Sequence, residues 1–392
     1  MRQASRRRGR TLALGAVSTA VVAAITVAMV GFPSHIWQGV PGEAVGESST
    51  VSPAFGAGAA QRLPGDAQQL PGDRDRSGRP RPNSDPSGLA DARRGLSDAR
   101  SYEEARGPLI ALLQAQGSPV ALAALDDLVR RQPRIAGVCH ALAHDLGHAA
   151  LERAGGSVGT ALSDRDDVCG GGYTHGVIEE ALAESNDPAA DMLRMCAPAQ
   201  DGSCFHGIGH GLMFVTGMDV DASLELCDRA PSSRLRGRCG EGVFMQYFSI
   251  DVASMHGSGP GTQRPSIDDA HTTCAETRGD YSANCWFYAP TVWLAAHPDD
   301  FAGALGWCAG ATSALARNVC ARGVGSRTVK FHPDDVTIGA RVCREAGEFI
   351  DECLAGMGSY WSVHWRGERE ASSVCPLLGD AMLERRCLTV ND

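Results

Sequence analysis

Residues 297–320 have the sequence HPDDFAGALGWCAGATSALARNVC, which predicts two helices joined by a short turn. Aspartate is a favoured N-cap, and apolar residues such as Phe301 and Leu305 follow it at helical spacing. We therefore expect a first helix from Asp299 to Cys308 and, after the turn, a second helix that contains Cys320. Cysteines on the two sides of such a turn can face each other across an antiparallel pair of helices. This stretch predicts one disulfide-bonded helix hairpin.

The same pattern returns along the chain. The tetrapeptide HPDD occurs again at residues 332–335, and the second cysteine of the last four close pairs recurs every 33 to 35 residues. A period near 34 residues is the length of one helix–turn–helix unit in an α-solenoid. We predict an all-α fold, a helix-hairpin repeat array. Residues 97–218 should form a histidine-rich helical region, and residues 219–392 should form the disulfide-bonded repeats.

The period is similar to that of Sel1-type and tetratricopeptide arrays over about residues 187–392. The Trp, Leu-Gly and Tyr signatures of those families are not clear in this sequence, and a disulfide in every repeat departs from their pattern. The resemblance therefore implies a stacked helical architecture, and it implies no functional residue.

The N-terminus has the features of a membrane anchor. Five arginines precede an apolar run at residues 11–32 that contains no charged residue. A run of roughly 20 such residues spans a bilayer, and the arginines favour a cytoplasmic location for residues 1–10. The alternative is a cleaved secretory signal, which has a shorter apolar region and a small-residue cleavage site. In both cases the rest of the chain is exported. We expect a single-pass membrane protein with an extracytoplasmic C-terminal domain, or a secreted protein if the segment is cleaved.

All 14 cysteines lie in the exported region, and none precedes Cys139. An even number of cysteines in such a region indicates disulfides, because an oxidising compartment lets them persist. Twelve of them form close pairs, and the remaining two pair by elimination. The predicted disulfides join Cys139 with Cys169, Cys196 with Cys204, Cys227 with Cys239, Cys274 with Cys285, Cys308 with Cys320, Cys343 with Cys353, and Cys375 with Cys387.

Composition predicts a linker followed by an acidic domain. Residues 33–96 are rich in Gly, Pro, Ala, Ser and Asp and have too few large apolar residues for a core, which indicates a flexible linker. The formal net charge is −10, so the chain after the five N-terminal arginines has a charge of −15. Such a region is unsuited to nucleic acid, because phosphate contacts need clustered Lys and Arg. The expected partners are the membrane, through the N-terminal helix, and an envelope protein or polymer.

Six of the 12 histidines are concentrated in three motifs that each begin with a cysteine. The motifs are CHALAHDLGH at residues 139–148, CGGGYTHG at residues 169–176 and CFHGIGHG at residues 204–211. Residues four apart on an α-helix lie on one face, and imidazole pairs at this spacing commonly chelate zinc or another first-row metal. In the second and third motifs a His-Gly pair comes six residues after the cysteine. Stacking of repeats would place these two histidines side by side.

These spacings predict a multi-histidine metal site. Two carboxylates, Glu179 and Glu241, are the candidate general bases, and they could also orient imidazoles or complete the coordination. Glycines around the histidines would let the helices approach closely or leave room for a metal, although tight packing alone could also require them. The alternatives are a metal-free acid/base site and structural histidines. The expected ligands are His140, His144, His175, His206 and His210, with His148 and Asp145 as additional candidates.

The types of ligand atom restrict which metal ion can bind. Imidazole suits zinc, copper, iron and nickel, whereas calcium and magnesium prefer oxygen ligands. We therefore expect a transition metal ion (zinc, copper or iron) in a membrane-anchored extracytoplasmic metal-binding protein. If the protein is a metalloenzyme, zinc would activate water for hydrolysis, and copper or iron would support redox chemistry. The alternative is a non-enzymatic solenoid of the cell envelope that binds a protein or polymer, with structural metal or none.

Overall fold

The computed structural model describes residues 86–391, apart from residues 167, 198–201, 249–264 and 365–369. Every regular element among the residues described is a helix, which confirms the all-α class. The predicted cytoplasmic segment (1–10), anchor (11–32) and most of the linker lie outside these residues. Within them, no helix is both long enough and apolar enough to cross a membrane. Residues 86–96, predicted as linker, instead lie in the first helix.

The N-terminal helices pack around their own core of leucine and alanine side chains. The first helix contacts the second, and its Ala92 and Leu96 are buried, because an apolar stripe of this helix docks on the next one. The folded part therefore begins before the predicted Ser97. The elements are α1 (Pro86–Asp98), α2 (Tyr102–Gln116), α3 (Ser118–Arg131), α4 (Pro133–Ala136), α5 (Cys139–Arg153), α6 (Val158–Leu162) and α7 (Val168–Ala183).

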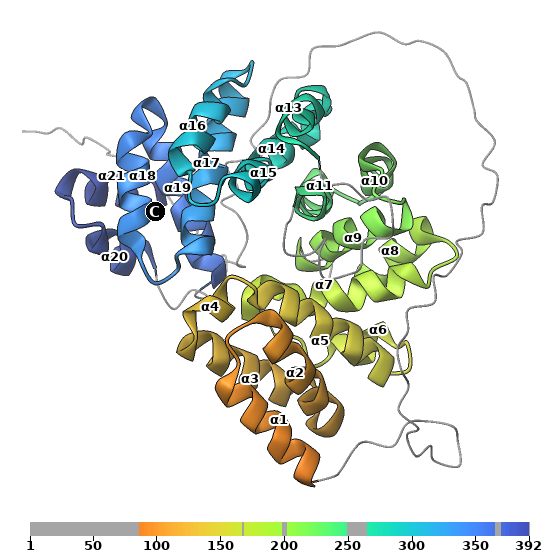
Figure 1. The fold of residues 1–392 in the computed structure, drawn as a ribbon. Helices are drawn as coiled ribbons and strands as arrows, with labels where there is room; N and C mark the ends of the chain where they lie inside the picture. The colour runs from red at the N-terminus through yellow and green to blue at the C-terminus, as the bar shows by residue number, and fades with distance from the viewer. Residues whose placement is uncertain (1–85, 167, 198–201, 249–264, 365–369, 392) are drawn as a thin grey trace, which may run out of the picture.

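The chain then alternates between a short first helix and a second helix that packs on the preceding second helix (Figure 1). The first helices are α8 (Pro188–Cys196), α10 (Val220–Cys227), α13 (Ile267–Glu276), α16 (Phe301–Ala309) and α18 (Val336–Glu345). The second helices are α9 (Gly202–Val215), α11 (Ser233–Phe248), α14 (Gly279–Tyr288), α17 (Ala314–Phe331) and α19 (Ile350–His364). The remaining elements are α15 (Pro290–Ala296), η2 (Gly347–Phe349), α20 (Ala371–Val374), η3 (Cys375–Leu378) and α21 (Ala381–Asn391).

Side-chain caps start the first helices, as the sequence pattern predicts. In the first HPDD copy, however, the cap is Asp300, which accepts a hydrogen bond from the backbone N–H of Gly303 (2.9 Å), so α16 begins one residue later than expected. Asp299 instead has φ of 62°. Its carboxylate accepts a hydrogen bond from Nε2 of His332 in the second HPDD copy (2.8 Å). The two copies therefore contact each other directly.

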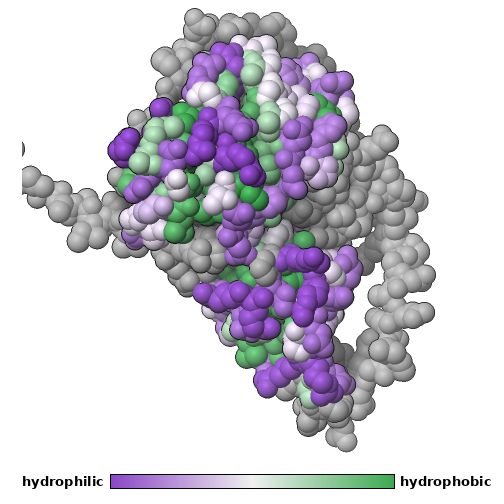
Figure 2. Space-filling view, turned by 60° about the vertical axis from the view of Figure 1, so that its left-hand side comes forward, coloured by the Kyte–Doolittle hydropathy of each residue, from purple (hydrophilic) through white to green (hydrophobic). Residues whose placement is uncertain are grey.

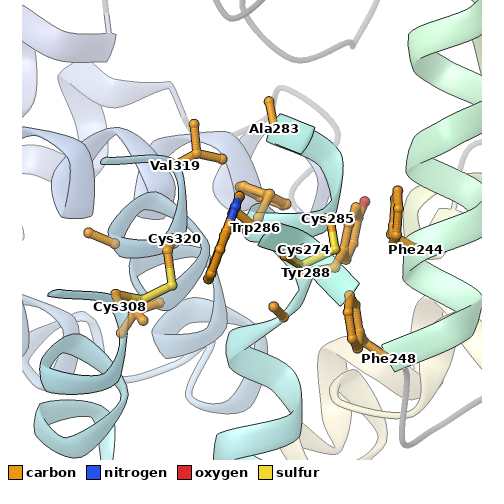
Figure 3. Close-up of a cluster of buried hydrophobic side chains, with 14 of the residues drawn as sticks. Phe244, Phe248, Cys274, Ala283, Cys285, Trp286, Tyr288, Cys308, Val319 and Cys320 are labelled. Atoms are coloured by element: carbon orange, nitrogen blue, oxygen red, sulfur yellow. A yellow bond between two sulfur atoms is a disulfide. The ribbon is translucent and has the colours of Figure 1, made fainter. Parts of the chain in front are cut away.

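Disulfides join the two helices of each hairpin. All six close pairs are bonded, with Cα atoms 5.3 to 5.8 Å apart. Figure 3 shows two of these bonds within the apolar core, with Trp286 between them. Each loop of this length stabilises the fold by roughly 2–3 kcal/mol in the chain-entropy model.

The seventh predicted disulfide, between Cys139 and Cys169, is not formed, and both residues are buried cysteines. Pairing by elimination assumed only that every cysteine forms a disulfide. These two begin α5 and lie at the start of α7, with the whole of α5 and α6 between them. Both pack into the N-terminal core, where a thiol behaves as a small apolar group.

The described residues form two hydrophobic cores, which meet at α7. Tyr173 and Val177 belong to the N-terminal core, whereas Ile178 and Leu182 of the same helix belong to the core of the hairpins. The chain also curves back on itself, because α19 contacts α7 across a long sequence separation (Figure 1). On the face seen in Figure 2, hydrophilic residues are interspersed with smaller hydrophobic groups.

Candidate metal centre

Three adjacent helices place the concentrated histidines in one interior region. His140, His144 and His148 lie on α5, His175 lies on α7, and His206 and His210 lie on α9. Helix α7 packs between α5 and α9, so both neighbours turn their histidine faces toward it. The four-residue spacing thus predicts correctly which side chains share a helix face.

Four of these histidines form a compact donor group. One nitrogen from each of His140, His144, His175 and His210 lies within 4.8 Å of the others. The closest pairs are Nε2 of His144 with Nε2 of His140 (3.0 Å) and Nδ1 of His175 with the same Nε2 (3.4 Å). A tetrahedral ion with metal–nitrogen bonds of 2.0–2.1 Å separates its ligand atoms by about 3.3 Å. The group is therefore close to the size of one coordination shell.

The opposite nitrogens of three of these rings are held by hydrogen-bond acceptors. Nδ1 of His140 donates to the backbone oxygen of Cys169 (2.7 Å), and Nδ1 of His144 donates to Oε2 of Glu179 (2.9 Å). Nδ1 of His210 donates to Oε1 of Gln246 on α11 (2.9 Å). Such outer contacts fix the tautomer and orientation of metal-binding imidazoles. In this tautomer each ring directs the lone pair of Nε2 inward.

A kink at the start of α7 supplies one of these acceptors. Cys169, Gly170 and Gly171 all have positive φ, between 56° and 77°. Two consecutive glycines accommodate this conformation without the steric cost that a side chain would add. The kink turns the carbonyl of Cys169 toward His140, and it explains two of the three glycines in the second motif. The third, Gly172, lies where an added Cβ would overlap the backbone oxygen of His140.

Glu179 is the carboxylate closest to the donor group and is almost fully buried. Its Oε2 lies 2.9 Å from Nδ1 of His144 and 3.0 Å from Nε2 of His148, and its Oε1 lies 3.7 Å from Nδ1 of His210. Burial alone would raise the pKa of Glu179, but the electrostatic attraction of His144, the hydrogen bonds of His144 and His148 and the electrostatic attraction of His210 outweigh it and hold the pKa well below its usual value. Glu179 is therefore ionised.

Burial also sets the protonation of the histidines. Desolvation, reinforced by neighbouring imidazoles, holds the pKa values of His140, His175 and His206 well below 6.5. These rings are neutral, as metal ligands must be. For His148 burial acts in the same direction, but the hydrogen bond and charge of Glu179 outweigh it and raise the pKa.

Five predicted residues lie outside the four-histidine group: His148 and Glu179 adjoin it, whereas His206, Glu241 and Asp145 have other partners. His206 is buried and stacks on His175 with ring centroids 4.6 Å apart, but its Nδ1 faces Oε2 of Glu241 at 3.6 Å. Glu241 in turn pairs with Arg238, and burial raises its pKa to about 7 although Arg238 opposes this shift. Asp145, a candidate ligand, points toward α2.

The position of Asp145 follows from the packing of α5. Its Oδ2 accepts a hydrogen bond from the hydroxyl of Tyr102 (2.5 Å) and pairs with Nε of Arg106 (3.1 Å), both on α2. The residue after a histidine on a helix lies about 100° away, so Asp145 faces the neighbouring helix when His144 faces the centre. Sequence reasoning missed Tyr102, Arg106 and Gln246. Gln246 had one usable signal, because it lies seven residues after Cys239, near the register that His210 holds after Cys204.

Glycines bring the ligand-bearing helices unusually close. A Cβ atom added at Gly176 would overlap the backbone oxygen of His144, and one added at Gly147 would overlap that of Tyr173. Helices α5 and α7 therefore cross with backbone against backbone. The same arrangement joins α9 to α11, where a Cβ on Gly209 would overlap the backbone oxygen of Cys239.

We expect Gly176→Ala to push α7 away from α5 and to weaken metal binding at least tenfold. Overpacking of this kind destabilises a fold by about 1–3 kcal/mol. Urea unfolding and competitive metal titration would measure the two effects. The matched control is Gly306→Ala in the exposed interior of α16, where an added Cβ meets nothing within 4 Å. That variant should gain up to about 1 kcal/mol. Equal behaviour of the two variants would show that the α5–α7 approach is not tight.

The donor set is four imidazoles with one carboxylate beside them, which suits zinc, copper, iron or nickel better than calcium or magnesium. The four imidazoles come from three helices, so this group, which could hold a metal ion, forms only in the folded chain. No protein-family model, no curated protein and no solved structure matches this chain.

Proposed function

We propose that this chain is a metalloprotein that binds one zinc, copper or iron ion through His140, His144, His175 and His210. The supporting observation is the approach of two acceptor nitrogens. Nε2 of His140 and Nε2 of His144 lie 3.0 Å apart, while the Nδ1 atom of each ring donates to an oxygen. Each ring already has a proton on Nδ1, so a hydrogen bond between the two Nε2 atoms would require one of the rings to be a charged imidazolium, and in the neutral pair the two lone pairs repel each other. A cation between them removes the repulsion and offsets the cost of burying the rings.

The number of protein ligands favours redox chemistry over hydrolysis at this ion. Four imidazoles complete a tetrahedral shell, whereas a hydrolytic zinc keeps one position for water. Copper or iron can change oxidation state without an open position, so electron transfer fits a buried, saturated ion. Of the two candidate general bases, Glu241 is paired with Arg238 beside His206, and only Glu179 contacts the four-histidine group.

A second candidate function is structural, and it is favoured by the location of the centre. The ligands lie on α5, α7 and α9, and the two hydrophobic cores meet within α7. An ion at this place would fasten the N-terminal helices to the hairpin array. In that case the array is a non-enzymatic module that binds an envelope protein or polymer.

We further propose that residues 11–32 anchor the chain in the membrane and that the centre lies outside the cytoplasm. The basic residues before the apolar run support this topology, and the six disulfides suit an oxidising compartment. The array is proposed to be an α-solenoid with a period of about 34 residues. The recurrence of the HPDD tetrapeptide and of the cysteine pairs supports this period.

Metal analysis of the purified full-length protein tests the proposal. Wild type should contain zinc, copper or iron at no less than one ion per chain by inductively coupled plasma mass spectrometry. The His144→Ala, His210→Ala double variant should contain almost none. The matched control is His297→Ala, His332→Ala, which removes two histidines outside the cluster and should retain the metal. Equal trace metal in all three proteins would refute the proposal.

A further inference from the structure

A second donor group adjoins the four-histidine group and shares one ring with it. Ligand atoms of His144, His148 and Glu179 also lie within 4.8 Å of one another. His144 directs Nε2 toward His140 (3.0 Å) and Nδ1 toward Oε2 of Glu179 (2.9 Å). The two groups therefore lie at opposite nitrogens of a single imidazole.

We propose that a second transition-metal ion binds to Nδ1 of His144, Nε2 of His148 and the carboxylate of Glu179. This inference rests on the proposed function, because the first ion occupies the Nε2 side of the same His144 ring. The centre is then dinuclear, with His144 as a bridging imidazolate. With metal–nitrogen bonds of about 2 Å on both sides of the ring, the ions are about 6 Å apart.

The bonding of Glu179 supports an ion at this position. Its Oε2 lies within 3.0 Å of two ring nitrogens, whereas its buried Oε1 has no hydrogen-bond partner. Hydrogen bonding alone would leave one oxygen of a buried carboxylate unsatisfied, which is costly. An ion between Glu179 and the two imidazoles can be coordinated by one or both carboxylate oxygens, so neither oxygen is left without a partner.

The charges around the second group also suit a cation. Besides Glu179, the carboxylate of Glu180 lies 3.4 Å from Nδ1 of His148. This outer carboxylate can orient His148, as Gln246 orients His210 in the first group. When the second ion binds, the proton on Nδ1 of His144 leaves to solvent, and the imidazolate charge offsets part of the added positive charge.

Exposure distinguishes the two positions. The side chains of His144 and Glu179 are buried, but the side chain of His148 is 25 % exposed. The second ion has only three protein ligands and one of them reaches the surface. It can therefore hold a water molecule in a fourth position, as catalytic metal sites do. The proposed centre thus pairs a closed ion with an open one, and water activation would belong to the second.

Cobalt and zinc titration of the chelated full-length protein tests the inference. We expect two ions per chain for wild type, one for His148→Ala, and two for the control His297→Ala. Circular dichroism would check that His148→Ala is folded. One ion per chain in wild type, or two in His148→Ala, would overturn the dinuclear centre and leave the proposed function intact. No ion in wild type would overturn both.

A spectroscopic measurement on wild type avoids dependence on any variant. When both positions hold Co²⁺, the shared imidazolate couples their spins, so the electron paramagnetic resonance intensity per cobalt should fall as the second equivalent is added. An intensity that doubles between one and two equivalents would show two independent ions and would overturn the bridge.

Discussion

Chelation of the metal should lower the free energy of unfolding by about 4 kcal/mol, relative to protein held at a free metal concentration about a thousand times its dissociation constant. The reason is that the proposed ligands come from three helices and meet only in the folded chain, so the proposed ion would bind the native state almost exclusively. Urea unfolding followed by circular dichroism, with chelator and with metal, measures the difference.

The loss of stability after chelation should differ from one part of the chain to another. The centre lies where the two cores meet in α7, whereas α17 and α19 are joined to their hairpin partners by disulfides. Chelation should therefore speed hydrogen exchange of amides in α5 and α7, with little change in α17 and α19. The His144→Ala, His210→Ala variant is the control, and chelator should leave its unfolding curve unchanged. Superimposable wild-type curves with and without metal would contradict the prediction.

Short-range sequence spacing was sufficient to predict the disulfide-bonded hairpins and the helix faces that carry the histidines. Each disulfide joins cysteines across one turn, so the sequence separation alone identified six pairs. The i, i+4 spacing of His140 and His144 likewise depends only on helix geometry. Both kinds of inference use contacts within one or two adjacent helices.

Contacts between distant helices could not be predicted in this way. Equivalent register predicts His175 beside His210, and their ring centroids are 5.3 Å apart, but it did not predict that His206 stacks on His175 (4.6 Å) while its Nδ1 faces Glu241. Asp145 is held by α2, whose sequence has no feature that identifies it as a partner of α5. The separation of Cys139 from Cys169 is a similar case, because pairing by elimination contains no information about geometry. These outcomes depend on how helices pack, which a single sequence specifies only weakly.

Acidification should destabilise the metal-free protein by about 3 kcal/mol per pH unit between pH 6.5 and 4.5. In this window the unfolded chain protonates His140, His175 and His206, whereas burial keeps their folded pKa values well below 6.5. Glu241 acts oppositely, since its pKa of about 7 makes the folded state take up one proton first. The unfolded state therefore binds about two more protons, and each contributes about 1.4 kcal/mol per pH unit.

Two further groups titrate outside this window, so they do not change the slope. The pKa of His148 is raised in the folded state, so above pH 6.5 the folded chain keeps a proton on His148 that the unfolded chain has lost. This proton stabilises the folded state, and the stabilisation is lost as the pH rises further. The lowered pKa of Glu179 contributes stability that is lost only as pH falls below 4.5.

Urea unfolding of chelated protein from pH 8 to 5 measures the slope of the free energy of unfolding against pH. His206→Phe removes one of the three buried imidazoles that stay neutral in the folded state. It should halve the slope, because the unfolded state then binds only one more proton than the folded state instead of two. A free energy of unfolding that stays constant from pH 6.5 to 5 would mean that the buried histidines take up protons without cost, which is incompatible with the packing of α5, α7 and α9 described above.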